Sequence, residues 1–221
     1  MINLPDFNKK WDYENNFYLT CDPDRITKFI AHYELYKRVM EIPGEIIECG
    51  VFKGVSLTRF AMFQKTLSNL RSKKLIAFDS FGDFPDTTYE PDKKFRQNFI
   101  TETGGGQSIS VEEMKKVLEY KGCESNVELV KGNICETLPK YVDNNQQLII
   151  SLLHLDTDIY EPSLTILEHL YPRLQTGGIL ILDDYGTFPG ETKAVQEYFS
   201  GISIKIKKFS FSVTPCYIVK E

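Results

Sequence analysis

"LIISLLHLDTDIYEPSLTILEHLYPRLQTGGILILDD", residues 148–184, holds two apolar runs on either side of an amphipathic stretch. The first run belongs to "QQLIISLLHLD" (146–156), which has the length and aliphatic content of a buried strand. "PSLTILEHLYPRL" (162–174) is predicted to be a helix with Pro162 in its first turn, and "TGG" then turns the chain into the strand "ILILDD" (179–184). A strand, a helix and another strand in this order predict parallel strands with helices packed on the sheet.

The same alternation extends in both directions along the chain. Further strands are predicted at 44–50, 73–81, 126–133, 203–211 and 216–221. Further helices are predicted at 24–40, 55–67, 111–121 and 190–200, the third of them begun by a capping box of Ser110 and Glu113. We expect one α/β domain with a doubly wound, mostly parallel seven-stranded sheet and an antiparallel C-terminal strand.

Two segments stand outside this alternation. Residues 1–42 are expected to form a helical N-terminal extension, and the aromatic residues at 7–18 suit either a homodimer contact or the wall of a binding pocket. Residues 82–108 are long and polar for a connection inside a compact domain, which is typical of a functional or mobile loop. We therefore expect a lid-like insertion there.

Composition excludes several classes of protein. The chain of 221 residues is 42% hydrophobic, enough for a substantial core, and its net charge of −5 without any basic stretch argues against a nucleic-acid partner. No apolar segment reaches the roughly 18 residues of a membrane span, and the first six residues do not resemble a signal peptide, so a cytoplasmic protein is expected. The five cysteines are scattered and form no C-x-x-C pair, which predicts reduced thiols.

Acidic residues follow four of the predicted strands: Glu48, Asp79, Asp156, and the pair Asp183 and Asp184. In an open parallel sheet, ligands bind outside the carboxyl ends of the strands, so these side chains are expected along one edge. Five carboxylates repel one another unless cations or hydrogen-bond donors separate them. The sequence therefore indicates at least two sites.

The first site is predicted at "ECGVFKGVS" (48–56). A turn with Gly50 lets a ligand approach backbone N–H groups, and the acid before it favours a cationic ligand. Asp79 stands where such folds hold a nucleoside ribose by its hydroxyls. The glycine spacing is not that of a dinucleotide fingerprint, and a plain strand-to-helix turn is the structural alternative.

The second site is predicted at Asp156, Asp183 and Asp184. Hard cations such as Mg²⁺ prefer oxygen ligands from two or three carboxylates, and a bound cation lowers the pKa of a substrate hydroxyl. The structural alternative is that these acids cap helices and keep loops hydrated. Asp158 or Glu161 is expected to serve the N-terminus of the helix that follows, because Pro162 already turns the chain.

Two other residues near these motifs have simpler expected roles. His154 shares a strand face with Asp156 and is expected to be a hydrogen-bonded histidine at the core, with a role as a base as the alternative. Lys193 is expected to be a solvated charge at the start of the last helix.

Five blocks of sequence carry a resemblance to a known family. They are "PGEIIECGVFKGVS" (43–56), "AFDSFGDFP" (77–85), "KGNICETLP" (131–139), "LHLDTDIYEPSLTILEHLYPRLQTGGILILDDYGTFPG" (153–190) and "KAVQEYF" (193–199). With these blocks the chain resembles the macrocin O-methyltransferase (TylF-like) family of class I S-adenosylmethionine-dependent methyltransferases, which have a Rossmann-like fold. The resemblance implies S-adenosylmethionine and Mg²⁺ or a similar divalent cation as cofactors, and a sugar or glycosylated small molecule as acceptor.

The resemblance also implies roles for particular residues. The implied S-adenosylmethionine contacts are Glu48, Gly50, Asp79, Ser80 and Asn133. The implied metal ligands are Asp156, Asp183 and Asp184, and Asp156 is the candidate general base. Related catechol-type enzymes place a lysine base three residues after the first metal aspartate, where this chain has Ile159. Deprotonation of the acceptor by Asp156 or by solvent is therefore the preferred interpretation.

Three other interpretations remain open from the sequence. "LDTD" resembles the D-x-D of glycosyltransferases that use nucleotide sugars, and dehalogenase-type phosphatases also carry such a pair. Neither accounts for "ECGVFKG" or for the closing strands. A binding protein without catalytic activity on the same fold is the third alternative.

Overall fold

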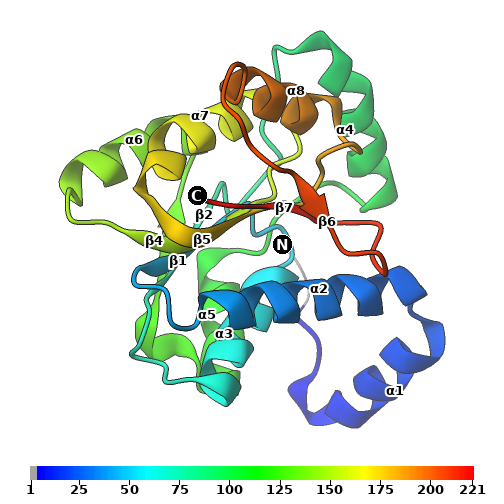
Figure 1. Ribbon diagram of the computed structural model, residues 1–221. Coiled ribbons are helices and arrows are strands. Elements are labelled where there is room, and N and C mark those ends of the chain that lie inside the picture. Colours follow the sequence, from blue (N-terminus) through cyan, green and yellow to red (C-terminus); the bar gives the residue numbers. More distant parts are fainter. Residues whose placement is uncertain (1–3) are drawn as a thin grey trace.

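The computed structural model describes residues 4–221, so the first three residues of the predicted extension lie outside it. Seven strands form one sheet in the order β3-β2-β1-β4-β5-β7-β6 (Figure 1). The strands are β1 Glu45–Cys49, β2 Leu75–Asp79, β3 Val127–Lys131, β4 Ile150–Leu155, β5 Leu174–Leu182, β6 Lys207–Lys208 and β7 Cys216–Val219. The first five are parallel to one another, and β7 pairs antiparallel with both β5 and β6. The predicted fold class is confirmed.

Helices cover both faces of the sheet (Figure 1). One face is covered by α2 Pro23–Val39, α3 Val55–Leu67 and α5 Val111–Lys121, and the other by α6 Ile134–Asn144, α7 Tyr160–Leu170 and α8 Pro189–Tyr198. Each face has its own apolar cluster, and the central strands contribute alternate residues to the two: Ile46 and Leu152 to one, Ile47 and Leu153 to the other. This two-sided burial explains why the central strands read as continuous aliphatic runs.

The N-terminal segment is helical, but only its second helix packs against the sheet. A 3-10 turn, Phe7–Lys9, leads into α1 Lys10–Thr20, which has no buried residue. The next helix, α2, starts where the Asp22 side chain accepts a hydrogen bond from the backbone of Asp24, with Pro23 in the first turn. Because α2 buries Leu35, Val39 and others, the sheet fixes α2 much more firmly than α1.

Four elements differ from their predicted extents. The 82–108 segment contains a 13-residue helix, α4 Glu90–Glu102, and α6 was not predicted although Asn133 caps it. In the predicted 203–211 strand, only Lys207–Lys208 pairs, while Ile204 and Ile206 pack on the core outside the ladder. Strand β5 begins at Leu174 rather than 179, because a register shift opposite β4 accommodates the glycine pair within the strand.

Other local expectations are confirmed. Ser110 and Glu113 form the predicted capping box, and α5 spans the predicted 111–121. Short 3-10 turns at Glu124–Asn126 and Tyr171–Arg173 lead into β3 and β5. Within residues 4–221, no helix combines the length and the apolar content that crossing a membrane requires.

Candidate active site

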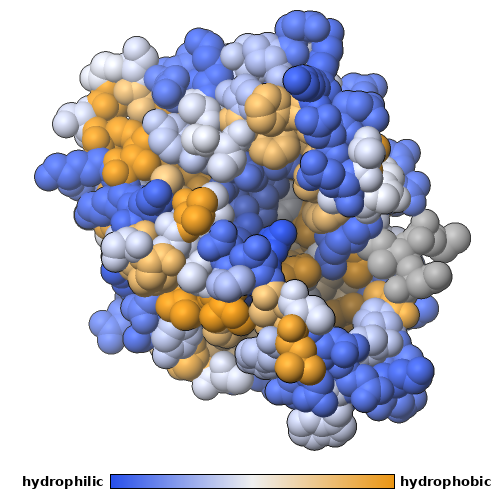
Figure 2. All heavy atoms as spheres, turned by 90° about the vertical axis from the view of Figure 1, so that its right-hand side faces the viewer, coloured by the Kyte–Doolittle hydropathy of each residue, from blue (hydrophilic) through white to orange (hydrophobic). Residues whose placement is uncertain are grey.

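A cleft of about 1410 Å³ opens at the carboxyl ends of the parallel strands. Residues that follow β1, β2, β3, β4 and β5 line it, together with parts of α1, α2 and the 82–108 segment. The face in Figure 2 is hollowed and bordered by both hydrophilic and hydrophobic side chains. The cleft therefore lies where an open parallel sheet binds its ligands.

Gly50 joins the ends of β1 and β4 at the base of this cleft. Its φ is +93°, and a Cβ atom there would lie 1.7 Å from the backbone oxygen of Asp156. The backbone N–H of Asp156 donates to the Cys49 carbonyl at 2.9 Å. A glycine is thus required for the close approach that brings Asp156 next to the turn after β1.

Asp79 organises the same turn from the neighbouring strand. Its Oδ2 accepts from the backbone N–H groups of Val51 at 2.7 Å and Phe52 at 3.2 Å, and its Oδ1 accepts from that of Phe81 at 2.6 Å. Phe52 and Phe81 both have positive φ, +47° and +44°. These bonds hold strained backbone in place, and the carboxylate lines the cleft.

The other predicted cofactor contacts fall in two places. Ser80 and Asn133 line the cleft; Ser80 donates to the Asp83 carbonyl at 2.9 Å, and Asn133 caps α6 through Cys135 N–H at 3.0 Å. Glu48 is fully buried and is not among the residues that line the cleft. It accepts a hydrogen bond from Ser56 at 2.8 Å and faces His154, and its predicted contact with the cofactor stays a prediction.

Three carboxylates converge beside Gly50: Asp156, Asp158 and Asp184 each offer one oxygen, and these oxygens lie within 4.8 Å of one another. Burial raises the pKa of Asp158, and the adjacent carboxylate of Asp184 raises it further. Burial likewise raises the pKa of Asp156, with a further contribution from Asp183. Such a cluster is stabilised by protons or by a cation.

Asp158 or Glu161 was expected to serve the N-terminus of the following helix; Glu161 lies in the first turn of α7, and Asp158 is placed differently. Its φ of +62° turns the chain so that its carboxylate meets Asp184. The first residue of α7, Tyr160, donates its backbone N–H to Asp92 of α4 at 2.9 Å instead. The αL conformation of an aspartate is the local feature that joins it to the acid cluster.

Asp183, a predicted metal ligand, is engaged by cations of the protein. Its Oδ2 pairs with the Lys28 ammonium and its Oδ1 lies 3.2 Å from His154 Nε2. Burial alone would raise the pKa of Asp183, but Lys28 and His154 hold it well below the usual range. The predicted metal set of Asp156, Asp183 and Asp184 therefore stays a prediction, and the carboxylate that converges with Asp156 and Asp184 in the structure is that of Asp158.

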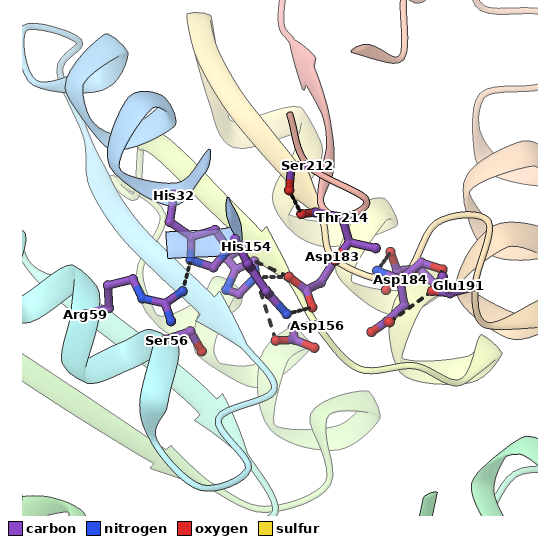
Figure 3. A network of polar contacts seen from close by, with 12 residues as sticks. His32, Ser56, Arg59, His154, Asp156, Asp183, Asp184, Glu191, Ser212 and Thr214 are labelled. Atoms are coloured by element: carbon purple, nitrogen blue, oxygen red, sulfur yellow. Dashed lines mark hydrogen bonds and ion pairs between the residues drawn. The ribbon is translucent and has the colours of Figure 1, made fainter. Parts of the chain in front are cut away.

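A buried network extends behind Asp183 (Figure 3). Arg59 Nη1 lies 3.1 Å from His32 Nδ1, and since a guanidinium only donates, Nδ1 accepts and the proton of the ring is on Nε2. Burial lowers the pKa of His32 to about 3, so this ring is neutral. Neither ring nitrogen of His32 has a free lone pair for a metal.

His154 is the charged member of this network. Burial would lower its pKa, but the Asp183 carboxylate at 3.2 Å and the Glu48 carboxylate at 3.7 Å raise it to about 10. His32, His154 and Asp183 also lie close enough to one another to hold a metal ion. In the structure they form a hydrogen-bonded network, and the prediction of a hydrogen-bonded core histidine is confirmed for His154.

The 82–108 segment is fastened across the cleft by Glu161. Its carboxylate accepts from Thr87 Oγ1 at 2.9 Å, Thr88 N–H at 2.7 Å and Tyr89 N–H at 3.2 Å. Asp92, one turn into α4, returns a bond to the start of α7. Asp92 thus acts on the start of α7, while Glu161 acts on the approach to α4 and also lies in the first turn of its own helix, α7.

No sequence pattern indicated a role at the site for Lys28 or Asp92. Lys28 comes from α2, more than a hundred residues before its partner Asp183, and Asp92 lies within a segment taken for a loop. Lys193 is the solvated charge that was expected, paired on the surface with Glu197 at 3.1 Å.

The sheet order, the helices on both faces and the acid-rich cleft define the class I methyltransferase fold. The sequence model of the macrocin-O-methyltransferase (TylF) family matches residues 25–213. The chain therefore belongs to the TylF family, as the resemblance in the sequence predicted.

Individual relatives agree with this membership. The chain is 28% identical to demethyldecarbamoylnovobiocin O-methyltransferase of Streptomyces niveus over 164 residues, which are 71% of this chain and 58% of the relative. It is 27% identical to 8-demethyl-8-(2,3-dimethoxy-alpha-L-rhamnosyl)-tetracenomycin-C 4'-O-methyltransferase of Streptomyces olivaceus over 148 residues, 65% of this chain and 54% of the relative. The chain thus spans less than two thirds of these curated relatives.

A solved structure matches over more of its length. The calicheamicin methyltransferase CalS11 superimposes with a TM-score of 0.78 at 26% identity, covering 95% of this chain and 85% of that one. Its apo structure, described as that of a TDP-rhamnose 3'-O-methyltransferase, gives a TM-score of 0.73 at 25% identity, with 95% and 86% covered. These findings give no support to the glycosyltransferase and phosphatase interpretations.

Proposed function

We propose that this chain is an S-adenosylmethionine-dependent O-methyltransferase that methylates a hydroxyl group on a sugar or glycosylated small molecule with the help of a divalent cation. The observation that carries the proposal is the convergence of Asp156, Asp158 and Asp184 beside the Gly50 turn, in a cleft of a TylF-family chain. The cation-binding cluster and the nucleoside-binding turn share one cavity, so a donor and an acceptor can meet there.

The cofactor half of the cleft fits a nucleoside with a cationic sulfonium. Gly50, Asp79, Ser80 and Asn133 form its wall, and Asp79 is held by backbone N–H groups with its carboxylate on the cleft. Acids around the turn favour a positively charged ligand over a pyrophosphate. Glu48 lies behind this wall, where it accepts a hydrogen bond from Ser56 and faces His154.

The cluster of Asp156, Asp158 and Asp184 fits a hard divalent cation such as Mg²⁺. All three donors are carboxylate oxygens, the type that Mg²⁺ prefers; burial raises their pKa values, and neighbouring carboxylates raise them further. A cation bound there would lower the pKa of an acceptor hydroxyl. Asp183 stays paired with Lys28 and supports the cluster from behind.

The residues of this chain have defined tasks in the transfer. The cleft walls hold the acceptor oxygen in line with the methyl group of the sulfonium. Asp156 accepts the hydroxyl proton, the new O–C bond forms, and the S–C bond breaks with its electron pair left on sulfur. Ile159, buried at the start of α7, has no group that could act as base, so Asp156 has this role.

The acceptor is proposed from the relatives and from the cleft. The name of one relative includes a rhamnosyl group, and CalS11 is described as acting on TDP-rhamnose. Aromatic side chains of Phe17, Phe84, Phe99 and Phe188 line the cleft and suit the apolar face of a sugar or an attached ring system.

The test is a methylation assay with S-adenosylmethionine and a panel of glycosylated natural products, TDP-deoxysugars and phenols, each with Mg²⁺ and with excess chelator. A product with one added methyl group on a sugar hydroxyl, formed only with the metal, is the expected result. Asp158→Asn should lower turnover at least about 100-fold while calorimetry shows unchanged binding of S-adenosylmethionine. Asp143→Asn, on the exposed side of α6, is the matched control.

Two outcomes would contradict parts of this proposal. Full turnover in excess chelator would remove the metal from it. A chain that neither binds S-adenosylmethionine nor methylates any acceptor would contradict the activity itself.

A further inference from the structure

Lys28 places a cation directly at the acid cluster, from an element distant in sequence. Its ammonium pairs with Asp183 Oδ2, and its side chain lines the cleft, 21% exposed. The carboxylates of Asp156 and Asp184 are near enough to act on its charge. The lysine thus lines the same cleft as the acid cluster, where the acceptor hydroxyl is proposed to react.

The helix that carries Lys28, α2, is held firmly in place. The N-terminus of α2 is fixed by the Asp22 cap and Pro23, and the helix buries five residues against the sheet. One turn after Lys28, His32 packs beside His154 and lies 3.8 Å from Asp183. Two residues on one face of α2 therefore meet the same carboxylate, which fixes the lysine relative to the sheet.

The ammonium keeps donors for a ligand. Lysine has three N–H bonds, and the structure records one hydrogen bond of Lys28, to Asp183. The other oxygen of Asp183 is bonded to His154. Donors of Lys28 that remain on its exposed side face the cleft.

Two other cations on the cleft wall are engaged elsewhere. Arg59 Nη1 is bonded to His32, and Lys53 Nζ donates to the Gln107 carbonyl at 2.6 Å. Lys28 is distinguished from both because its partner, Asp183, directly precedes Asp184 of the acid cluster.

We propose that Lys28 is a catalytic residue that donates a hydrogen bond to the reacting oxygen of the acceptor and stabilises its negative charge as it attacks the methyl group. The role rests on the proposed O-methyltransferase activity. The hydroxyl proton goes to Asp156, the O–C bond forms and the S–C bond breaks, while Lys28 keeps its proton throughout. Preorganised donors at a developing oxyanion contribute strongly to catalysis.

The first experiment compares Lys28→Met and Lys28→Arg with the wild-type chain and with Lys37→Met, an exposed lysine on the same helix. Lys28→Met should lower kcat about 100-fold, with the Kd for S-adenosylmethionine unchanged within about twofold. Lys28→Arg should retain part of the activity because it keeps the charge. Lys37→Met should match the wild type.

A second comparison separates direct action from simple pairing with Asp183, and it also serves if Lys28→Met folds poorly. Asp183→Asn and Lys28→Met/Asp183→Asn remove the buried carboxylate that would otherwise be left unpaired. Direct action predicts that the double variant turns over about 100-fold more slowly than Asp183→Asn alone. Equal turnover of these two variants, or wild-type kcat in Lys28→Met, would overturn the proposal.

The same series distinguishes failure of this inference from failure of the proposed function. If the wild-type chain methylates an acceptor and Lys28→Met does so equally well, only the role of Lys28 is wrong. If the wild-type chain methylates nothing, the proposed activity is wrong and with it this role.

Discussion

At the scale of single residues, the site depends on two chain segments that nearly touch. Gly50 and the Asp156 carbonyl leave no room for a side chain, since a Cβ at Gly50 would lie 1.7 Å from that oxygen. The contact is between backbones, so rotation of a side chain cannot relieve it. The position of Asp156 in the acid cluster is therefore fixed by a residue with no chemistry of its own.

Gly50→Ala should be strongly destabilising. The overlap with backbone and the positive φ of +93° together predict a loss of about 4 kcal/mol in the free energy of unfolding. Denaturant unfolding measures this loss, and calorimetry should show much weaker binding of S-adenosylmethionine by any folded fraction.

Gly201→Ala is the matched control for this variant. Gly201 has a similar φ of +79°, but nothing lies within 4 Å of the added Cβ. Its cost should be limited to the conformational strain, about 1 to 2 kcal/mol. Equal losses in the two variants would contradict the close-approach argument.

The sequence placed acids at the site but could not choose among them. Asp183 and Asp184 are neighbours, and successive residues of an extended chain point to opposite sides, which the prediction of both as ligands did not take into account. Which of the two faces inward depends on His154 and Lys28, from other elements. Asp158 joins the cluster through its αL backbone, which sequence patterns do not indicate for an aspartate.

At the scale of elements, Glu161 and Asp92 join the 82–108 segment to α7. The predicted loop holds α4 because Pro91 suits the first turn and because Asp92, buried, makes its bond across to Tyr160. The polar composition of this segment did not indicate a helix, because the residue that Asp92 bonds, Tyr160, is remote in sequence. By contrast, α5 was predicted correctly because its capping box is local.

Glu161→Gln should loosen the start of this segment. The Glu161 carboxylate accepts from Thr87, Thr88 and Tyr89 through its two oxygens. A carboxamide has only one acceptor oxygen. Amide hydrogen exchange at Thr88 and Tyr89 should become roughly tenfold faster. Glu168→Gln, an exposed residue of the same helix without a recorded partner bond, should leave this exchange unchanged.

The contribution of Glu161 also has a defined dependence on pH. Burial would raise its pKa, but hydrogen bonds from Thr88 and Thr87 lower it below the ordinary value of 4.5. Because the folded pKa is the lower one, the stabilisation is complete above that value and is lost as the pH falls through the folded pKa. Protection of the two amides should fall in acid in the wild type, and Glu161→Gln should lack this dependence; an identical pH profile would contradict it.

At the scale of the whole molecule, the fold could be predicted because each central strand is buried on both faces. Aliphatic runs such as those around Ile47 and Leu153 mark such strands in the sequence without knowledge of their neighbours. The closing strands were harder, since Ile204 and Ile206 have a strand-like alternation but contact the core without pairing. Periodicity reports burial, whereas pairing depends on the partner strand.

Burial also divides the N-terminal extension into two parts with different consequences for stability. None of the buried residues recorded in the described chain precedes Ala31, and the 3-10 turn before α1 touches the rest through the Phe7–Tyr120 ring stack at 4.3 Å. Phe17, Tyr18 and Thr20 nevertheless line the cleft. The first helix therefore belongs to the site more than to the core.

Deletion of residues 1–20 should consequently leave the fold intact and weaken only the binding of the acceptor. A loss of about 1 kcal/mol, from the few contacts of α1, corresponds to a fall in Tm of about 2 to 4 °C for a chain of this size. The Kd for S-adenosylmethionine should stay unchanged, while the KM for an acceptor that the wild type methylates should rise. Leu35→Ala in the buried face of α2 is the contrasting variant, with an expected loss of about 2 to 5 kcal/mol. Unfolding of the deletion variant would show that α1 supports the core. An unchanged acceptor KM would show that α1 is not a wall of the cleft.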